Sequence, residues 1–311
     1  MVDVSPVYVE TARSGRFKEI IEEAYEILNN CTLCPRRCRV DRLGGEVGFC
    51  KTGEQAVVSS WDPHFGEEAP LVGRRGSGTM FFTHCNLLCI FCQNYDISHL
   101  GYGRVVSAND LADIMLSLQA AGCHNINLVT PSHVVPQILV AVAIAAEKGL
   151  RVPLVYNTGG YDRVSTLRLL EGIIDIYMPD FKFWDRHVAD EICQAPDYPA
   201  VARRAVKEMH RQVGDLVIDE AGIARRGLLV RHLVLPGGLS GTETVMAYIA
   251  SDISENTYVN VMAQYRPCGR AHEVKALAAP LSRGAYRAAL QAAEKSGITR
   301  LDKFRRVFMF K

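Results

Sequence analysis

The feature that most constrains the fold is a series of short, continuous apolar runs that alternate with segments of helical periodicity. Such runs are typical of strands buried on both faces of a parallel sheet, with helices as the crossovers. The six runs span residues 79–83, 126–130, 152–156, 173–178, 228–235 and 258–263. The candidate helices between them span 108–121, 136–148, 165–171, 198–213 and 242–251. The pattern predicts an α/β protein of six βα units, but periodicity does not separate an incomplete barrel from an open doubly wound sheet.

The rest of the chain predicts two flanking regions. Residues 11–29 and 281–298 carry apolar residues at helical spacing, and Gly297 is a suitable stop for the second helix. Between the first helix and about residue 75 the chain is rich in Gly and Pro, so we expect an irregular segment organised by metal. The expected organisation is an N-terminal segment over 1–75, a core over 76–275 and a C-terminal helical extension over 276–311.

Composition and charge exclude several classes of protein. The chain has 311 residues, 48% hydrophobic and 22% charged, which is enough for a substantial core. Its 35 Lys and Arg against 34 Asp and Glu leave a net charge of +1, which provides no overall field for nucleic acid or an anionic membrane. The longest apolar run, 138–146, is shorter than the roughly 20 residues that span a bilayer. The sequence start shows no export signal, and we expect a cytoplasmic protein without a membrane partner.

Ten cysteines are present, and seven of them fall into two groups. In a chain without an export signal, clustered cysteines are more often metal ligands than disulfide partners. Cys85, Cys89 and Cys92 directly follow the first apolar run. A cubane iron–sulfur cluster normally takes four cysteines, so three leave one iron open to a substrate or cofactor. The plainer alternative is zinc or a ferredoxin-type site completed by a distant Cys or His. Three scattered cysteines are expected to be core thiols: Cys123, Cys193 and Cys268.

The spacing Cys85-x-x-x-Cys89-x-x-Cys92, with Phe91 before the third cysteine, resembles the signature of the radical S-adenosylmethionine superfamily. The resemblance implies a [4Fe–4S] cluster whose open iron binds the amino and carboxylate groups of S-adenosylmethionine. It also implies reductive cleavage to a 5′-deoxyadenosyl radical, which abstracts hydrogen from a substrate that the sequence does not identify. An electron donor such as flavodoxin or ferredoxin is the partner expected for that chemistry.

Further segments are similar to the pyruvate formate-lyase activating enzyme-like branch, here with an N-terminal cysteine-rich segment. They are residues 93–94, 156–160, 178–182, 230–237 and 260–265. The resemblance covers roughly residues 76–272 and implies a partial (β/α)6 TIM-type barrel. Two departures stand out. The second run ends at residues 128–133 without the glutamate of the branch's Gly-Gly-Glu turn, and Tyr265-Arg266 stand where the branch has a histidine.

The resemblance also implies residues that bind S-adenosylmethionine. Lys182 and Arg231 are the cations best suited to its carboxylate, which an arginine can bind bidentately. Asn157 and Asp180 would bind the ribose or the amino group. Three further residues are expected to bind the cofactor because they lie at the end of the cysteine motif or of a strand: Asn94, Thr130 and Gln264. In the alternative without such a site, the two cations form surface ion pairs and Asp180 is a turn residue.

A loop before the first apolar run offers candidates for proton transfer. His64, Glu67 and Glu68 lie in a segment bracketed by Gly and Pro, next in sequence to the proposed site. We expect these three residues to contact substrate or to transfer a proton in catalysis. The alternative is a surface loop with ordinary charges.

The first cysteine group supplies four thiolates within 20 residues: Cys31, Cys34, Cys38 and Cys50. Four sulfurs satisfy either a second [4Fe–4S] cluster with no open iron or a structural zinc, and a disulfide is a third alternative. The spacing is not that of a zinc ribbon, which favours the cluster. This loop also contains four arginines, a feature that can indicate nucleic-acid binding: Arg36, Arg37, Arg39 and Arg42. We prefer the interpretation that they offset the negative charge of a cluster or are solvated.

The sequence leaves three functions, in order of preference. The first is a radical S-adenosylmethionine enzyme acting on a protein glycyl site, a peptide or a small molecule. The glycyl site is disfavoured because the extra cysteines precede the motif instead of following it. The second is a non-enzymatic electron-transfer or sensor protein with two clusters. The absence of a fourth cysteine near Cys85 in the sequence argues against it. The third is a zinc-stabilised nucleic-acid-binding protein.

Overall fold

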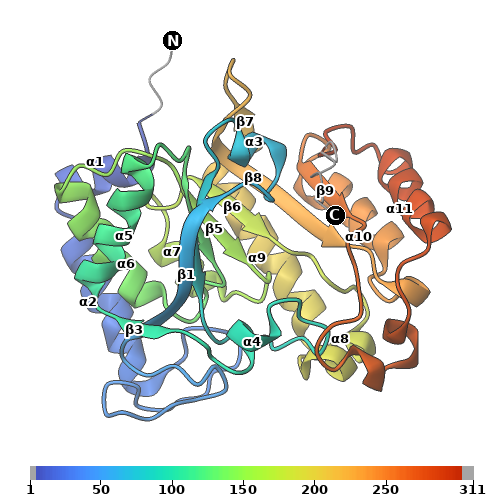
Figure 1. Cartoon of the computed structure of the whole chain (residues 1–311), viewed down its shortest axis with the longest axis horizontal. Helices are drawn as coiled ribbons and strands as arrows, with labels where there is room; N and C mark the ends of the chain where they lie inside the picture. Colours follow the sequence, from blue (N-terminus) through green and yellow to red (C-terminus); the bar gives the residue numbers. More distant parts are fainter. Residues whose placement is uncertain (1–4, 303–311) are drawn as a thin grey trace.

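The computed structural model describes residues 5–302, which form a mixed α/β structure around one large sheet (Figure 1). Six strands of this sheet are parallel, lie side by side in chain order and correspond to the six predicted runs. They are β2 Ser77–Phe82, β4 Ile126–Val129, β5 Leu154–Thr158, β6 Ile176–Pro179, β8 Ala224–Leu233 and β9 Tyr258–Met262. The prediction of an α/β protein with a mostly parallel sheet is confirmed.

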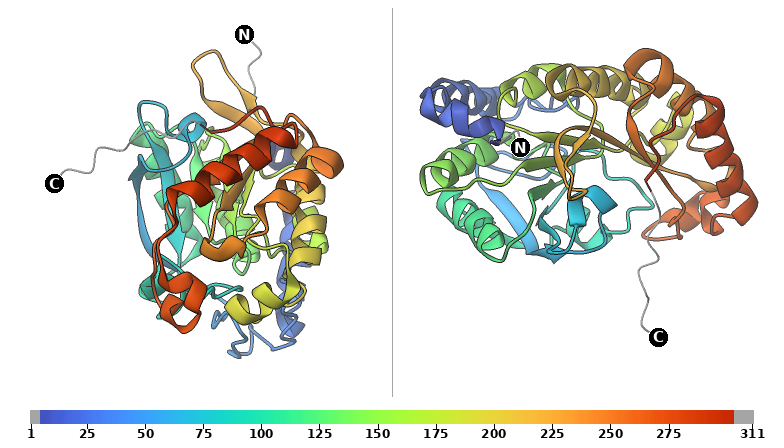
Figure 2. Two further views of the ribbon diagram at one scale, coloured as in Figure 1. Left: turned by 90° about the vertical axis from the view of Figure 1, so that its right-hand side faces the viewer. Right: turned by 90° about the horizontal axis from the view of Figure 1, so that it is seen from above.

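The crossover helices explain why these runs are apolar throughout. Every position of β5 and β6 is buried, because helices cover the sheet. Right-handed crossovers between neighbours in chain order carry all the helices to one side, and Figure 2 shows them on the outside of the curved sheet. They are α5 Ala108–Ala120, α6 Val135–Glu147, α7 Val164–Leu169, α8 Arg186–Cys193, α9 Tyr198–Val213 and α10 Thr242–Tyr248. The sheet is not closed into a complete barrel.

The N-terminal segment differs from its prediction in two places. The helix expected over 11–29 is two helices, α1 Val7–Arg13 and α2 Phe17–Glu26, separated near Gly15, whose φ is +74°. Residues 56–64, expected to be irregular, form strand β1 Ala56–His64, which pairs antiparallel with β2 and with β3 Arg104–Val106. The prediction failed there because β1 is only partly buried and its apolar pattern is weak. β1 therefore joins the sheet across the expected boundary at residue 75.

The remaining elements are short, apart from the C-terminal helix. The helix expected over 281–298 is confirmed as α11 Arg283–Lys295, followed by Gly297 at a φ of +89°. The short elements are α3 Ala69–Val72, α4 Tyr95–Ser98 and β7 Val217–Ile218. Residues 303–311 of the expected C-terminal extension lie outside the described residues. Within residues 5–302, no helix has both the length and the apolar character needed to cross a bilayer.

Candidate functional site

The loop after β2 carries the second cysteine group at the carboxyl edge of the parallel strands, which is the lower edge in Figure 1. Its sulfurs accept hydrogen bonds. Leu87 N–H donates to Cys85 Sγ at 3.3 Å, and Ser98 Oγ–H donates to Cys92 Sγ at 3.2 Å. Burial, followed by the charge of Cys89, raises the pKa of Cys85 to about 12. Hydrogen bonds to sulfur are typical around cysteines that hold a metal, so this donor set fits an iron–sulfur centre.

A fourth cysteine lies against this group. Cys193, at the end of α8, is 3% exposed, and its Sγ lies 3.2 Å from Cys89 Sγ. The hydrogen bond from Cys193 lowers the pKa of Cys89 although burial opposes this. Cys193 is buried in the core, as expected, but the expectation that no fourth cysteine is near Cys85, Cys89 and Cys92 is wrong. The reason is that α8 brings a cysteine more than a hundred residues away back onto the loop.

The ends of β5, β6 and β8 bring four of the predicted cofactor-binding residues into direct contact. Arg231 donates through Nε to Asp180 Oδ1 and through Nη2 to Asn157 Oδ1, both at 2.7 Å. Lys182 Nζ donates to the other oxygen of Asp180 at 2.5 Å. The side chains of the three charged residues are only 13–17% exposed, which excludes surface ion pairs. These four residues are called the polar network below.

The charges in the polar network support one another. Burial opposes ionisation of Asp180, but the charges of Arg231 and Lys182 outweigh it and hold the pKa of Asp180 below its ordinary value. Burial disfavours the charged form of Lys182. The negative charges of Asp180 and Cys89 outweigh this effect, so the pKa of Lys182 is raised. The polar network lies next to the second cysteine loop, because a Cβ on Gly159 would be 3.5 Å from Leu87 Cδ2 and 3.6 Å from Lys182 Cε.

Glu67 reaches the polar network from the loop after β1. Its Oε2 lies 3.7 Å from Arg231 Nη1, and its side chain is 10% exposed. Burial, followed by the charge of Glu68, raises the pKa of Glu67 to about 7. Glu68 is 4% exposed, and its Oε1 accepts a hydrogen bond from Asn260 Nδ2 at 2.9 Å, while its Oε2 has no partner among the described residues. With Asp180, these carboxyls outnumber the two cations of the network.

His64 is not brought to this site. It is exposed, and its backbone pairs with Ser77 at the amino end of β2. The loop that follows His64 leads to α3 at the top of Figure 1, whereas α4 and the cysteine loops lie at the bottom. Of the three predicted proton-transfer residues, only Glu67 and Glu68 extend into the interior.

The other three predicted cofactor-binding residues lie around the carboxyl edge. Thr130, just after β4, donates its N–H to Asn157 O at 2.8 Å. The carbonyl of Gln264 accepts a hydrogen bond from Gln93 Nε2 at 3.1 Å, which places the end of β9 beside the second cysteine loop. Asn94 is exposed at the start of α4. Thr130 therefore adjoins the polar network, while Asn94 and Gln264 lie nearer the cysteines.

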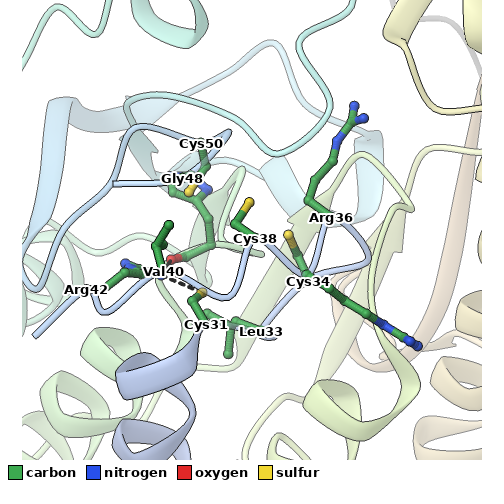
Figure 3. Close-up of a pocket in the computed structure, with 11 residues that line it drawn as sticks. Cys31, Leu33, Cys34, Arg36, Cys38, Val40, Arg42, Gly48 and Cys50 are labelled. Atoms are coloured by element: carbon green, nitrogen blue, oxygen red, sulfur yellow. Dashed lines mark hydrogen bonds between the residues drawn. The ribbon is translucent and has the colours of Figure 1, made fainter. Parts of the chain in front are cut away.

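The first cysteine group shares one small cavity of about 10 Å³ (Figure 3). Its four thiols line this cavity: Cys31, Cys34, Cys38 and Cys50. Gly48 lets the chain pass, because a Cβ there would lie 2.7 Å from both Cβ and Sγ of Cys38. The next residue, Phe49, donates its N–H to Cys38 Sγ at 3.3 Å. The loop is thus shaped around the sulfurs.

The thiols of this cavity resist ionisation on their own. Burial, followed by the charge of Cys50, raises the pKa of Cys34 to about 12. A metal cation would remove this penalty, and four sulfurs suit either a cluster or zinc. Arg42, which is 1% exposed, lies 4.0 Å from Cys31 Sγ and is therefore not solvated. No group of three or more His, Cys, Asp or Glu in residues 5–302 stands at metal-binding spacing, so both ligand sets remain predictions.

One arginine joins the two cysteine groups. Arg36, in the first cysteine loop, donates through Nε to Asn86 O at 2.9 Å and through Nη2 to Cys193 O at 2.7 Å. It also donates to Gln194 O. Its guanidinium stacks over Phe49, 3.8 Å from the ring centroid. Arg36 therefore links the first cysteine loop to the second cysteine loop and to the end of α8, which also contact each other through Cys89 and Cys193.

Two residues behind the polar network were missed by sequence reasoning. The Tyr198 hydroxyl accepts the Lys182 N–H at 2.8 Å and itself contacts main-chain carbonyls. The buried ring of His232 contacts Phe181 O through Nδ1 at 2.7 Å. Both hold the segment that carries Asp180 and Lys182. An isolated tyrosine in a helix and a histidine in a strand give no local signal of this role.

Comparison with known proteins shows similarity to an archaeal protein. Over 283 residues, 88% of this chain and 77% of the other, the chain is 31% identical to the uncharacterized protein MJ0674 of Methanocaldococcus jannaschii. No protein-family model matches the chain.

Proposed function

This chain belongs to the same family as that archaeal protein, and we propose that it is a radical S-adenosylmethionine enzyme. It would reductively cleave S-adenosylmethionine at a [4Fe–4S] cluster held by Cys85, Cys89 and Cys92. The observation that carries the proposal is that this cysteine loop and the polar network lie side by side at the carboxyl edge of a parallel sheet, with Leu87 and Lys182 both next to Gly159 at the end of β5. Parallel α/β proteins build their active sites at that edge.

We further propose that the sheet is a partial (β/α)6 TIM-type barrel. Six parallel strands that neighbour one another in chain order, with the helices outside, support this architecture. A doubly wound sheet instead reverses its strand order near the centre. A partial barrel also leaves an interior in which Arg231 and Glu67 can meet.

The chain's own residues would bind and orient the cofactor. When bound, the cluster and S-adenosylmethionine supply the 5′-deoxyadenosyl radical that abstracts hydrogen from the substrate. Asp180 and Asn157 hold Lys182 and Arg231 in place, and within residues 5–302 both cations keep N–H groups that could donate to a carboxylate. When Glu67 is ionised, the buried carboxyls outnumber the two cations, which favours a ligand that carries positive charge, such as an ammonium or a sulfonium. Glu67, with a pKa of about 7, can hold or release a proton at neutral pH.

Replacing Arg231 with glutamine is expected to weaken S-adenosylmethionine binding roughly 10- to 100-fold, the effect of losing a hydrogen-bonded charge. The iron content of the second centre should not change, because Arg231 is not a ligand. Equilibrium dialysis of the reconstituted protein with labelled cofactor measures the affinity.

Arg225 provides the matched control, since it lies on the same strand and pairs with Asp219 Oδ2 at 2.6 Å. Arg225→Gln should bind the cofactor like the wild type. Equal binding by both variants would remove Arg231 from the site.

A second candidate function is a non-enzymatic electron-transfer or sensor protein with two clusters. The contact between Cys193 and Cys89 favours it, since a fourth thiol could close the cluster. Replacing Cys193 with alanine separates the two functions. For the radical enzyme we expect iron to be retained and 5′-deoxyadenosine still to form, because three cysteines suffice. If the Cys193 variant loses iron and the wild type forms no deoxyadenosine, the closed cluster is favoured. Cys123→Ala, at another buried cysteine, is the control.

The experiment that tests the proposed function is anaerobic reconstitution with iron and sulfide, followed by dithionite and S-adenosylmethionine. Chromatography measures 5′-deoxyadenosine, and iron analysis counts the centres. Iron for two cubanes would identify the first cysteine group as a second [4Fe–4S] cluster, and iron for one with bound zinc would identify it as a zinc site. An iron-replete, reduced protein that neither forms deoxyadenosine nor changes its electron paramagnetic resonance spectrum with the cofactor would contradict the proposal.

A further inference from the structure

A second pocket, of about 490 Å³, opens beside the first cysteine loop, between that loop, the start of α7 and the first turns of α9. Four arginines line it: Arg37, Arg163, Arg168 and Arg204. In a chain whose net charge is only +1, four arginines against two aspartates, Asp162 and Asp197, are a local excess of positive charge. Two of the four arginines also contact the first cysteine loop, since Arg163 Nη1 donates to Thr32 O at 2.7 Å and Arg37 lines the thiol cavity as well.

The acids of this pocket form no ion pair with its arginines within residues 5–302. Asp162 is buried and accepts hydrogen bonds from Tyr156 and Thr158. Asp197 accepts the hydroxyl of Tyr161 at 2.6 Å. Among the ion pairs within residues 5–302, none involves Arg37 or Arg204, and Arg168 reaches only Glu208, at 4.0 Å. The positive charge is therefore available to a partner.

The pocket is next to the first cysteine group. Arg37 stands between Cys34 and Cys38 in sequence and lines both the thiol cavity and this pocket. Its neighbour Arg36 continues inward to the second cysteine loop. A partner on the pocket would therefore lie against the first metal centre, with the second centre behind it.

We propose that this arginine pocket is the docking surface for an acidic electron-carrier protein of the flavodoxin or ferredoxin type. The inference rests on the proposed function, because it assumes an iron–sulfur centre that must be reduced. The carrier gives up one electron and an iron–sulfur centre of this chain gains it, with no atom transferred. A protein suits the site better than a small anion because Arg37, Arg168 and Arg204 are all exposed, and the side chain of Arg168 is 67% exposed. Exposed charges of this kind steer association between proteins.

The test measures the affinity of the reconstituted protein for oxidised flavodoxin and for oxidised ferredoxin by isothermal titration calorimetry. We expect binding of at least one carrier, weakening as salt rises. Arg204→Glu should weaken that binding about tenfold at low salt and slow reduction by the reduced carrier to a similar extent. Arg287→Glu, an identical charge change on the exposed face of α11, should leave both unchanged. Dithionite, which needs no docking surface, should reduce all three proteins alike.

The outcomes separate the docking surface from the proposed function. Deoxyadenosine formation with dithionite, combined with carrier binding that Arg204→Glu and Arg287→Glu affect equally, would overturn the docking surface and leave the proposed function standing. Absence of carrier binding to the wild type would overturn the docking surface too. Salt-dependent binding that Arg204→Glu alone weakens supports the docking surface, even if dithionite yields no deoxyadenosine and the proposed function fails.

Discussion

Replacing Cys89 with alanine is expected to abolish 5′-deoxyadenosine formation and to remove iron from one centre while leaving the other. Cys89 lies at the middle of the second cysteine group and is buried beside Cys193. The positive charge of Lys182 favours its thiolate. Its loss leaves two thiols of the motif, too few for a cubane that normally takes four cysteines and here would take three. Iron and sulfide analysis, together with chromatography of the reaction, measures both effects.

The reciprocal variant is Cys34→Ala, which removes a thiol from the cavity of the first group. It should empty the first centre and leave iron at the second. Circular dichroism of both variants shows whether the fold persists. Equal loss of iron from both centres in each variant would contradict the division of the seven cysteines into two sites.

Replacing Arg36 with alanine is expected to lower the iron content of the second centre although Arg36 is not a ligand. The variant leaves the carbonyls of Asn86, Cys193 and Gln194 without their donor. Asn86 and Cys193 are buried, whereas Gln194 is exposed. An unsatisfied buried acceptor costs about 1–3 kcal/mol, so two of them should lower the free energy of unfolding by about 2–4 kcal/mol. Denaturant unfolding measures the stability, and electron paramagnetic resonance of the reduced protein distinguishes the two centres.

Two variants make this prediction specific. Arg36→Lys keeps the positive charge but not the planar guanidinium, so it should recover little of the iron content and stability that Arg36→Ala loses. Arg39→Ala, an exposed arginine of the same loop, should behave like the wild type. If Arg36→Ala and Arg39→Ala retain iron equally, the two cysteine loops are not coupled through Arg36.

Much of the fold could be predicted because its signal is local. The six parallel strands and their helices carry continuous apolar runs and helical periodicity, and both survive in the sequence whatever the rest of the chain does. β1 could not be predicted in this way. It is partly buried, and its later residues, from Ser59 to His64, are polar or exposed apart from Trp61. Its place in the sheet is fixed by pairing with β2, which is a long-range interaction.

The candidate site likewise has features with a local sequence signal and features that depend on long-range contacts. The cysteine spacings, and the order in which Asn157, Asp180 and Arg231 follow their strands, can be read from the sequence. Three contacts arise only in the folded chain: Cys193 with Cys89, Arg36 with both cysteine loops, and Glu67 with Arg231. His64 remains outside the site. The physical reason is that spacing along the chain encodes local geometry, whereas Arg36 and Cys193 are 157 residues apart and meet only because the crossovers return each strand end to the same edge of the sheet.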